Sequence, residues 1–483
     1  MPPPVPSSEK AVSLADRMKF FPSFLECEKA KDDLKETDKI TNSVLCAGVF
    51  FVLMGFPLAC INREAVQLTG AFGHLQAIVC AKAGCLLEFG VVPALVAGLC
   101  CQLAAASKTI SVDTSSAGDK AAFGKLVKMA TVLLGFVMAV FYVFAADMYG
   151  TGLSISSVFI VIQLTAANFF VALLDEMMQK GNGLYSAGSS IPLWMGVTSA
   201  ERIMSSFVQF WGKGDDMVGS IPNVPYALWT SSNKFFGLVS TVYRPEQPNL
   251  VQGLFSVITA GLVLYLLRWR SELTVTSTRA RGMGQKYPVN VMYTYNIPLF
   301  YFIGFTAMAL FTSQILAVAF PNPLTRKFGQ WSDGVPVSGL ISYICPPPNL
   351  KSVLQDPFRV VFYAVYVITF CGIMSKTWIE VAGACSRDLA KSLRDQNIVV
   401  RGFRDTALTG IVDRYVPTSA MLSGMFLGAI VVIGDFGGSY QSGVGVVLCV
   451  TVAWNIQEEM LKTNPQMMQM AKQRMMGAQG AGN

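Results

Sequence analysis

The amino-acid sequence contains about ten apolar stretches, each close to the length of a membrane-spanning helix. They cover residues 41–60, 91–107, 123–145, 154–175, 189–210, 250–268, 297–317, 358–376, 417–434 and 442–460. A bilayer core is crossed by about 20 apolar residues in an α-helix, because a helix satisfies its own backbone hydrogen bonds. Only 14% of the residues are charged, whereas soluble domains carry about 25%. The sequence therefore predicts an all-α polytopic membrane protein.

The lysine and arginine residues indicate which loops face the cytosol. When the N-terminus is placed in the cytosol and the sides alternate, roughly 27 of the 37 basic residues fall on the cytosolic side. The two large cytosolic loops are then residues 269–296 and 377–416, and the loop of residues 212–249 faces the opposite side. Residues 1–40 and the tail of residues 463–483 are both predicted to be cytosolic.

The predicted cytosolic ends differ in character. Apolar residues recur at helical spacing near the N-terminus, at Leu14, Met18, Phe21 and Leu25, which predicts a short amphipathic helix on the membrane surface. No apolar core precedes the first span, so this segment is not typical of a cleavable signal, and the first span is expected to act as the targeting signal. The Met-, Gln- and Gly-rich tail is typical of disordered chain.

The segment between the first two spans, residues 61–90, is only weakly apolar. Charged residues interrupt it at Arg63, Glu64, Lys82 and Glu88. Lipid-exposed chain does not tolerate such charges or irregular backbone at membrane depth. The pattern predicts a half-inserted or cavity-lining segment.

The reactive side chains argue against catalysis. The chain has one histidine, His74, which excludes most His-based acid–base chemistry and most zinc sites. Its eleven cysteines form no paired CxxC pattern, and most lie in apolar runs where they act as small buried hydrophobes. We expect no catalytic residue, no metal and no cofactor.

The ionisable residues in the spans also weaken a transporter interpretation. They lie near span ends, at Asp147, Asp175, Glu176, Glu201, Arg202 and Glu380. An ion-coupled transporter usually holds such a group at mid-membrane, where the coupling ion binds. A secondary transporter with a broken-helix substrate site remains the alternative, and a mid-membrane charge pair or a polar pocket would support it. A membrane enzyme ranks below both, because no nucleophile–base pattern is evident.

Eight short motifs occur in one collinear order along the chain. In and beside the second cytosolic loop they are Ser375-Lys-Thr-Trp-Ile-Glu380, Asp388-Leu-Ala-Lys391, Arg401-Gly-Phe-Arg404-Asp405 and Arg414-Tyr-Val-Pro417. Elsewhere they are Asp147-Met-Tyr-Gly150, Leu174-Asp-Glu-Met-Met-Gln-Lys-Gly181, Tyr293-Thr-Tyr-Asn-Ile-Pro298 and Gly443-Val-Gly445. Together they resemble the SecY family, whose eukaryotic members are the channel-forming alpha subunits of the Sec translocon. The resemblance extends from about residue 18 to residue 462.

The resemblance implies two five-span halves, residues 41–211 and 250–462, around an hourglass pore in the endoplasmic reticulum membrane. Secretory polypeptide would cross through the pore, and membrane segments would leave sideways into lipid. Such a conduit needs a narrow ring of flexible apolar side chains, since specific polar sites would retain the passing chain. Matched position by position, the pore ring falls on Val91, Leu95, Ile191, Met195, Phe300 and Leu448.

The resemblance also implies a plug, a short helix that blocks the resting pore. It corresponds to about residues 61–81, where Gly70, Gly73 and His74 suit a small, movable element. The alternative is an ordinary re-entrant loop, in which His74 is a tolerated polar side chain.

The implied lateral gate lies between the second and third spans on one side and the seventh and eighth on the other. The family commonly has polar residues there, but this chain has Val96, Ala139 and Met308 at the matched positions. Either the alignment is displaced, or this gate closes by apolar packing. We expect a less polar gate with an altered opening threshold, and polar side chains that bridge the closed gate would contradict this expectation.

The first cytosolic loop predicts a β-hairpin, because residues 273–276 and 287–291 flank a Gly-containing turn with arginines at its tip. By resemblance, both basic loops dock the ribosome, whose RNA phosphates suit the paired donors of arginine. The matched residues are Arg281 and Arg404, with Arg279, Lys286 and Arg401 as electrostatic support. The alternative is that these charges only set the membrane topology.

The resemblance implies further partners. They are the nascent chain with its signal peptide, small beta and gamma translocon subunits, post-translational translocation factors, a lumenal chaperone and the lipid bilayer. Since no catalytic residue is expected in this chain, the energy for transport would come from the translating ribosome or another motor.

Overall fold

The computed structural model describes residues 27, 36–61, 72–107, 109–110, 117–183, 189–210, 218–231, 233–242, 244, 248–277, 284–290, 296–332, 335–347, 350–381, 398–400 and 408–463. Within them, eight helices are long and apolar enough to cross a membrane. Two more helices complete the ten predicted spans. One is α3 (Val92–Ala106), which is shorter, and the other is α6 (Ile191–Val208), which carries Glu201 and Arg202.

We refer to the helices of the first five spans as the N-terminal half. They are α2 (Glu36–Gly55), α3, α4 (Ala117–Val140), α5 (Ile155–Met177) and α6. A π-helical turn extends α4 (η2, Phe141–Ala145), and another extends α5 (η3, Met178–Asn182). Pro93 and Pro192 lie in the first turns of α3 and α6, where a helix does not need the backbone N–H that proline lacks.

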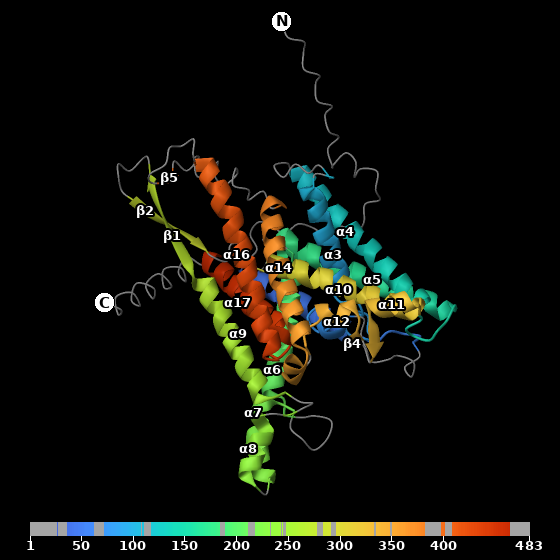
Figure 1. The fold of residues 1–483 in the computed structure, drawn as a ribbon. Coiled ribbons are helices and arrows are strands. Elements are labelled where there is room, and N and C mark those ends of the chain that lie inside the picture. The colour runs from blue at the N-terminus through green and yellow to red at the C-terminus, as the bar shows by residue number, and fades with distance from the viewer. Residues whose placement is uncertain are drawn as a thin grey trace.

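The helices of the last five spans form the C-terminal half. They are α9 (Leu250–Arg268), α10 (Ile297–Ala319), α14 (Pro357–Val381), α16 (Leu408–Phe436) and α17 (Ser442–Thr463). Helix α14 packs along α16 within this half, and α17 packs against α6 of the N-terminal half (Figure 1). The two halves therefore meet along α6 and α17 on one side.

Some span boundaries differ from the predicted ones. Helix α9 covers the predicted residues 250–268, but α2 covers Glu36–Gly55 instead of 41–60. Residues 56–58 leave the helix because they pair with the chain before α3: Leu86 N–H donates to the Phe56 carbonyl at 2.9 Å. Helix α16 begins at Leu408 and contains Pro417, so the helix extends ahead of its apolar span, which covers Val416–Phe436 and agrees with the predicted residues 417–434. Proline removes one helical hydrogen bond, but it does not end a helix that packs along a neighbour.

A three-stranded sheet joins the two loops that were predicted to be cytosolic. Strands β1 (Arg270–Ser277) and β2 (Gly284–Asn290) pair antiparallel, with Leu273 opposite Tyr287, which confirms the predicted hairpin. Strand β5 (Ile398–Val400), from the second loop, pairs with the other edge of β1. This third strand was not predicted.

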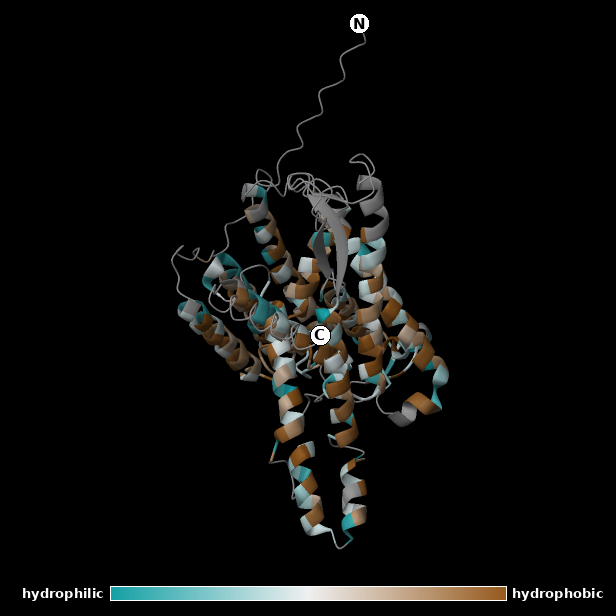
Figure 2. Ribbon diagram, turned by 90° about the vertical axis from the view of Figure 1, so that its left-hand side faces the viewer, coloured by the Kyte–Doolittle hydropathy of each residue, from teal (hydrophilic) through white to brown (hydrophobic). Residues whose placement is uncertain are grey.

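Shorter elements cover the opposite end of the bundle. Helices α7 (Ser220–Thr230) and α8 (Lys234–Val242) form a hairpin that projects away from the bundle (Figures 1 and 2). Between α10 and α14 lie α11 (Pro323–Phe328), the β3–β4 hairpin (Gln330–Ser332 and Val335–Ser338), α12 (Leu340–Ile344) and α13 (Leu350–Gln355).

Apolar side chains both fill the bundle and cover its outside. One large cluster of buried residues includes side chains from both halves. On the outside, α2, α5, α9 and α14 expose residues such as Val44, Phe159, Leu254 and Phe358. Figure 2 shows this apolar character along the long helices. A helix that is apolar on its exposed face suits contact with lipid.

Candidate functional site: a closed apolar constriction

The predicted pore-ring residues lie in one apolar cluster. Val91, Leu95, Ile191, Met195 and Leu448 are buried members of it, and Phe300 packs against it while partly buried. They come from the start of α3, from α6, from α10 and from α17, so both halves contribute. All six therefore contact the apolar interior of the bundle, and their role as a pore ring stays a prediction.

The chain before α3 packs into the same cluster. Phe72, Leu75, Ile78 and Val79 are fully buried there, around the short 3₁₀-helix η1 (Gly73–Leu75). The Cys80 thiol lies 3.1 Å from the Thr198 hydroxyl of α6, which ties this segment to the N-terminal half. Of the predicted plug residues, Gly73 and His74 lie in η1, and Gly70 lies outside the described residues.

A tight backbone contact holds this segment against the start of α3. Val91 N–H donates to the Val79 carbonyl at 3.0 Å, and Gly90 has a φ of +54°. A Cβ at Gly90 would lie 2.0 Å from the Val79 oxygen, so only glycine fits this close approach.

His74 stays uncharged in this position. Burial, helped by the positive charge of Arg359 on α14, lowers its pKa to about 4. A neutral imidazole can remain against an apolar cluster at neutral pH, whereas an imidazolium would resist burial. This fits the expectation of a tolerated polar side chain rather than a ligand.

The predicted gate positions are largely apolar. Ala139 is buried in the cluster, and Val96 and Met308 pack against it. Helices α3 and α10 approach closely at Gly304, where an added Cβ would lie 2.9 Å from Leu99 Cδ1. However, one polar pair bridges the same two helices: the Tyr301 hydroxyl donates to Gln102 Oε1 at 3.4 Å. This contact counts against a wholly apolar gate, but it involves none of the three matched positions, and the less polar gate stays a prediction.

Two carboxylates, Asp175 and the buried Asp435, fix the start of the last helix in each half. Asp175 of α5 accepts from the backbone N–H of Ser190 at 2.6 Å and from its hydroxyl at 2.8 Å, just before α6. Asp435 of α16 accepts from Gly443 N–H at 2.7 Å at the start of α17 and from the Tyr363 hydroxyl at 2.6 Å. In both halves, then, a carboxylate near the end of the fourth span binds the backbone at the start of the fifth.

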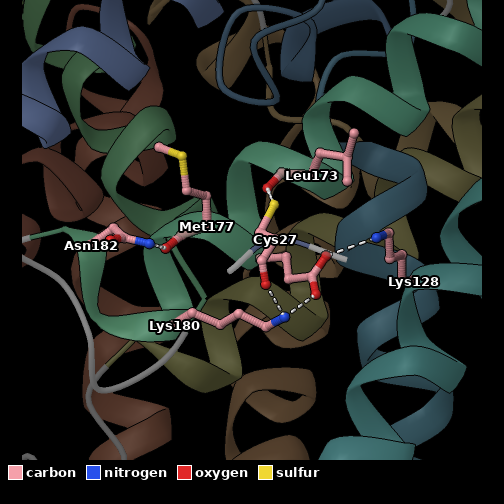
Figure 3. A network of polar contacts seen from close by, with 7 residues as sticks. Cys27, Lys128, Leu173, Met177, Lys180 and Asn182 are labelled. Carbon is pink, nitrogen blue, oxygen red and sulfur yellow. Dashed lines mark hydrogen bonds and ion pairs between the residues drawn. The ribbon is translucent and has the colours of Figure 1, made fainter. Parts of the chain in front are cut away.

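A charged network anchors the chain ahead of the first span (Figure 3). Glu176, in the last turn of α5, lies 2.7 Å from Lys128 Nζ and 2.8 Å from Lys180 Nζ. Lys180 also donates to the carbonyl of Cys27, whose thiol lies 3.6 Å from the Leu173 carbonyl. Burial raises the pKa of the Cys27 thiol. Since Glu176 lies at a helix end, this pair anchors the N-terminal segment and is not the mid-membrane pair that a transporter would need.

Most of the predicted ribosome-docking residues lie outside the described residues: Arg279, Arg281, Arg401 and Arg404. Lys286 lies on β2, with its backbone opposite Thr274 of β1. Strand β5, which ends at Val400, pairs with β1. Among the residues that the structure describes, no three His, Cys, Asp or Glu side chains gather into a metal site.

The arrangement defines a class of protein. Two five-helix halves share one buried apolar cluster, into which the segment ahead of α3 also packs, and this arrangement suits a protein-conducting channel. The fold matches solved channels. It has a TM-score of 0.74 to "The structure of a protein conducting channel", at 22% identity, over 94% of this chain and 97% of that one. It has a TM-score of 0.71 to Sec61 in the canine ribosome-channel complex from the endoplasmic reticulum, at 22% identity, over 94% of this chain and 97% of that one.

Sequence comparison identifies the family. The SecY family pattern matches residues 85–457. The protein transport protein Sec61 subunit alpha of Dictyostelium discoideum is 34% identical over 439 residues, which cover 88% of this chain and 91% of that protein. The chain therefore belongs to the SecY family. It is a protein-transport channel component and not an enzyme, and the transporter alternative is set aside.

Proposed function

We propose that this chain forms the channel through which secretory polypeptide crosses the endoplasmic reticulum membrane and from which apolar segments leave into lipid. The observation that supports it most is that one apolar cluster holds five of the six ring residues, from both halves, with Phe300 packed against it and with Phe72, Leu75, Ile78 and Val79 also buried in it. We propose that this packing is the closed channel. Opening then requires that residues 72–79 leave the cluster and that the ring widens.

The ring residues would act by being apolar and flexible. An apolar constriction excludes hydrated ions, because it offers nothing to replace their water. It also offers no hydrogen bonds that would hold a passing peptide. A translocating chain would take the place of residues 72–79 against the same side chains.

Ion leak through the idle channel tests the ring. The double variant Leu95→Ala and Leu448→Ala shortens two buried ring side chains, and we expect it to conduct ions in planar bilayers without substrate. The matched control is Leu254→Ala with Leu264→Ala, because both of these leucines are exposed on α9. Equal and low conductance in the two folded variants would refute the ring assignment.

For ribosome docking, the sheet gives a reason why two separate loops act together. Strands β1 and β2 carry the first loop, and β5 connects the second loop to the same sheet. We propose that Arg281 and Arg404 bind RNA phosphates and that Arg279, Lys286 and Arg401 add positive potential. The canine and yeast relatives of this fold were solved with ribosomes, the yeast one as the idle Ssh1 complex at 25% identity and a TM-score of 0.72, over 90% of this chain and 92% of that one.

Charge reversal tests the docking loops. Arg281→Glu with Arg404→Glu should lower ribosome affinity at least tenfold in a salt-dependent manner, with membrane insertion intact. The control, Arg326→Glu with Lys327→Glu on α11, changes the net charge equally at the other end of the bundle. If the two variants bind ribosomes equally well, the charges of the loops only set topology.

The remaining assignments concern the surroundings of the channel. We propose that both ends of the chain are cytosolic and that small beta and gamma subunits, the signal peptide, post-translational factors and a lumenal chaperone are its partners. Protease protection of tags at the two ends, in sealed microsomes, tests the orientation. Tags that are protected from the protease would place the two ends on the lumenal side and contradict this orientation.

A further inference from the structure

Two carboxamide side chains on α10 are buried, yet each has an oxygen without a hydrogen-bond partner. Asn296, at the start of the helix, is 3% exposed, and Gln314, near its end, is 5% exposed. Among the residues that the structure describes, no group donates to Asn296 Oδ1 or to Gln314 Oε1. A buried acceptor that has lost its water without gaining a donor destabilises the fold. Such an atom points to a donor that the closed protein does not itself supply.

The side chain of Asn296 does not serve its own helix. An asparagine at the start of a helix usually accepts a hydrogen bond from a backbone N–H of the first turn. Here the backbone carbonyl of Asn296 accepts from the N–H groups of Leu299 and Phe300, but the side chain makes no capping bond. Capping therefore does not explain why a polar side chain is buried at this position.

The two carboxamides lie on the face of α10 that carries the predicted ring residue Phe300. Phe300 follows Asn296 by four residues and Gln314 follows Phe300 by fourteen, which are about one and four helical turns. Between the two carboxamides, this face presents three fully buried apolar residues of the large cluster, Ile303, Ala307 and Leu310. The face is therefore apolar along its middle and has one unpartnered acceptor near each end of the span.

A translocating polypeptide carries the donor that these oxygens lack. Every residue except proline has a backbone N–H, and this group loses its bound water when the chain enters an apolar constriction. A neutral carboxamide oxygen accepts such a bond from any sequence, whereas a carboxylate would retain basic segments through stronger, charge-assisted bonds. Acceptors at the two ends of the face also leave the ring itself apolar.

We infer that Asn296 and Gln314 bind the backbone of the translocating chain through their carboxamide oxygens, one on each side of the ring. The inference rests on the proposed function, in which Phe300 belongs to that ring. The eighteen residues from Asn296 to Gln314 rise by about 27 Å along the helix. An extended chain covers about 3.3 Å per residue. About eight residues of the passing chain therefore lie between the two carboxamides.

Removal of the two oxygens should slow transport without destabilising the protein. The carboxamide variant, Asn296→Leu with Gln314→Met, keeps most of the side-chain volume. We expect it to translocate a precursor into proteoliposomes two- to tenfold more slowly than the parent protein, with an unchanged or higher midpoint of thermal unfolding.

The matched control is Thr306→Val, because Thr306 is fully buried on the same helix and its hydroxyl has a partner, 3.3 Å away on Tyr366. This control should lower the unfolding midpoint and leave the translocation rate unchanged. A carboxamide variant that translocates at the parent rate overturns the inference. So does one whose midpoint falls as that of the control does, because the oxygens would then stabilise the fold itself.

A precursor with fewer backbone N–H groups separates backbone binding from other effects. In one precursor a run of alanines passes through the channel, and in a second precursor every other alanine of that run is proline, which has no N–H. Proline should slow transport by a larger factor in the parent protein than in the carboxamide variant. Equal factors in the two proteins would overturn the inference.

Disulfide crosslinking to a stalled precursor serves if the carboxamide variant folds poorly. Under a mild oxidant, Asn296→Cys and Gln314→Cys should each crosslink to a precursor cysteine, at precursor positions about eight residues apart. The control is Phe305→Cys, because Phe305 is exposed on the opposite face of α10. The parent protein, which has eleven cysteines of its own, gives the background. Equal crosslinking from position 305 would overturn the inference.

The outcomes distinguish this inference from the proposed function. If the Leu95 and Leu448 variant leaks and the carboxamide variant translocates at the parent rate, the channel assignment stands and backbone binding is refuted. If the Leu95 and Leu448 variant does not leak, the proposed constriction itself fails.

Discussion

The pH dependence of stability should reveal two titratable groups of opposite effect, the buried Glu88 and the partly buried His74. Glu88 and His74 both lie in the chain between α2 and α3, outside the spanning helices. Burial raises the pKa of Glu88 from 4.5 to about 7, against the hydrogen bonds from Gly84 and Tyr142. Burial lowers the pKa of His74 from 6.5 to about 4, with Arg359 adding to the effect.

The two signs follow from proton binding. Between pH 4.5 and about 7 the folded protein holds the Glu88 proton more tightly than the unfolded chain, so this carboxyl makes stability fall as pH rises. Between about pH 4 and 6.5 the unfolded chain holds the His74 proton more tightly, so this imidazole makes stability rise with pH. Each pKa differs by about 2.5 units from its ordinary value, which corresponds to about 3 kcal/mol in the free energy of unfolding. The contributions of the two groups largely oppose each other.

Single variants should separate the two effects. In denaturant titrations of the detergent-solubilised protein between about pH 4.5 and 6.5, Glu88→Gln should rise in stability with pH by up to about 3 kcal/mol. The stability of His74→Gln should fall by a similar amount as pH rises. The stability of the parent protein should change least with pH. The other groups near Glu88 do not titrate in this window, since burial raises the pKa values of Tyr149 and of the Cys85 thiol, the latter opposed by Lys82.

The result that would refute this reasoning is a Glu88→Gln profile parallel to that of the parent protein. The carboxyl would then be solvated or ionised in the folded state at every pH tested. A parallel profile for His74→Gln alone would refute only the assignment for the imidazole.

Other substitutions test single contacts. Asp435→Asn weakens the acceptor for Tyr363 and Gly443, and it should cost about 1–3 kcal/mol in denaturant titrations, unlike an exposed Asp356→Asn control. Gly90→Ala places a Cβ against the Val79 carbonyl and should lower the midpoint of thermal unfolding; an unchanged midpoint would contradict the tight contact. Tyr301→Phe removes one long hydrogen bond between α3 and α10, so idle conductance should rise by less than about tenfold, and a larger rise would show that this pair dominates gate closure.

The sequence was a better guide to the secondary-structure elements than to the contacts between them. Ten apolar stretches are visible because a bilayer requires about 20 apolar residues per helix, whatever the tertiary structure. The hairpin of β1 and β2 was also predictable, since alternating residues flank a glycine-containing turn. Strand β5 was not, because three residues in a polar loop carry no periodic signal. The extension of α16 ahead of Pro417 was not predicted, because the residues before this proline are polar and the apolar pattern marks only the span.

For the site residues, too, the local sequence carries little information about tertiary packing. Val91 and Leu448 could be named only through resemblance to a family, since any apolar residue in a span could equally face lipid. Glu88 was noted as an interruption in an apolar segment, but its partner Tyr142 lies 54 residues away in the chain. The local sequence cannot specify such a pairing, and only the fold brings the two residues together.

The proposed gate positions have a consequence for how a signal sequence would open such a channel. Between helices in a membrane there is no hydrophobic driving force, because lipid tails are as apolar as the side chains they would replace. If Val96, Ala139 and Met308 line the gate, as we propose, then close packing holds it, and the Tyr301–Gln102 bond adds little at 3.4 Å. An apolar signal helix would offer the same kind of contact to α3 and α10, so it would replace that packing at small cost.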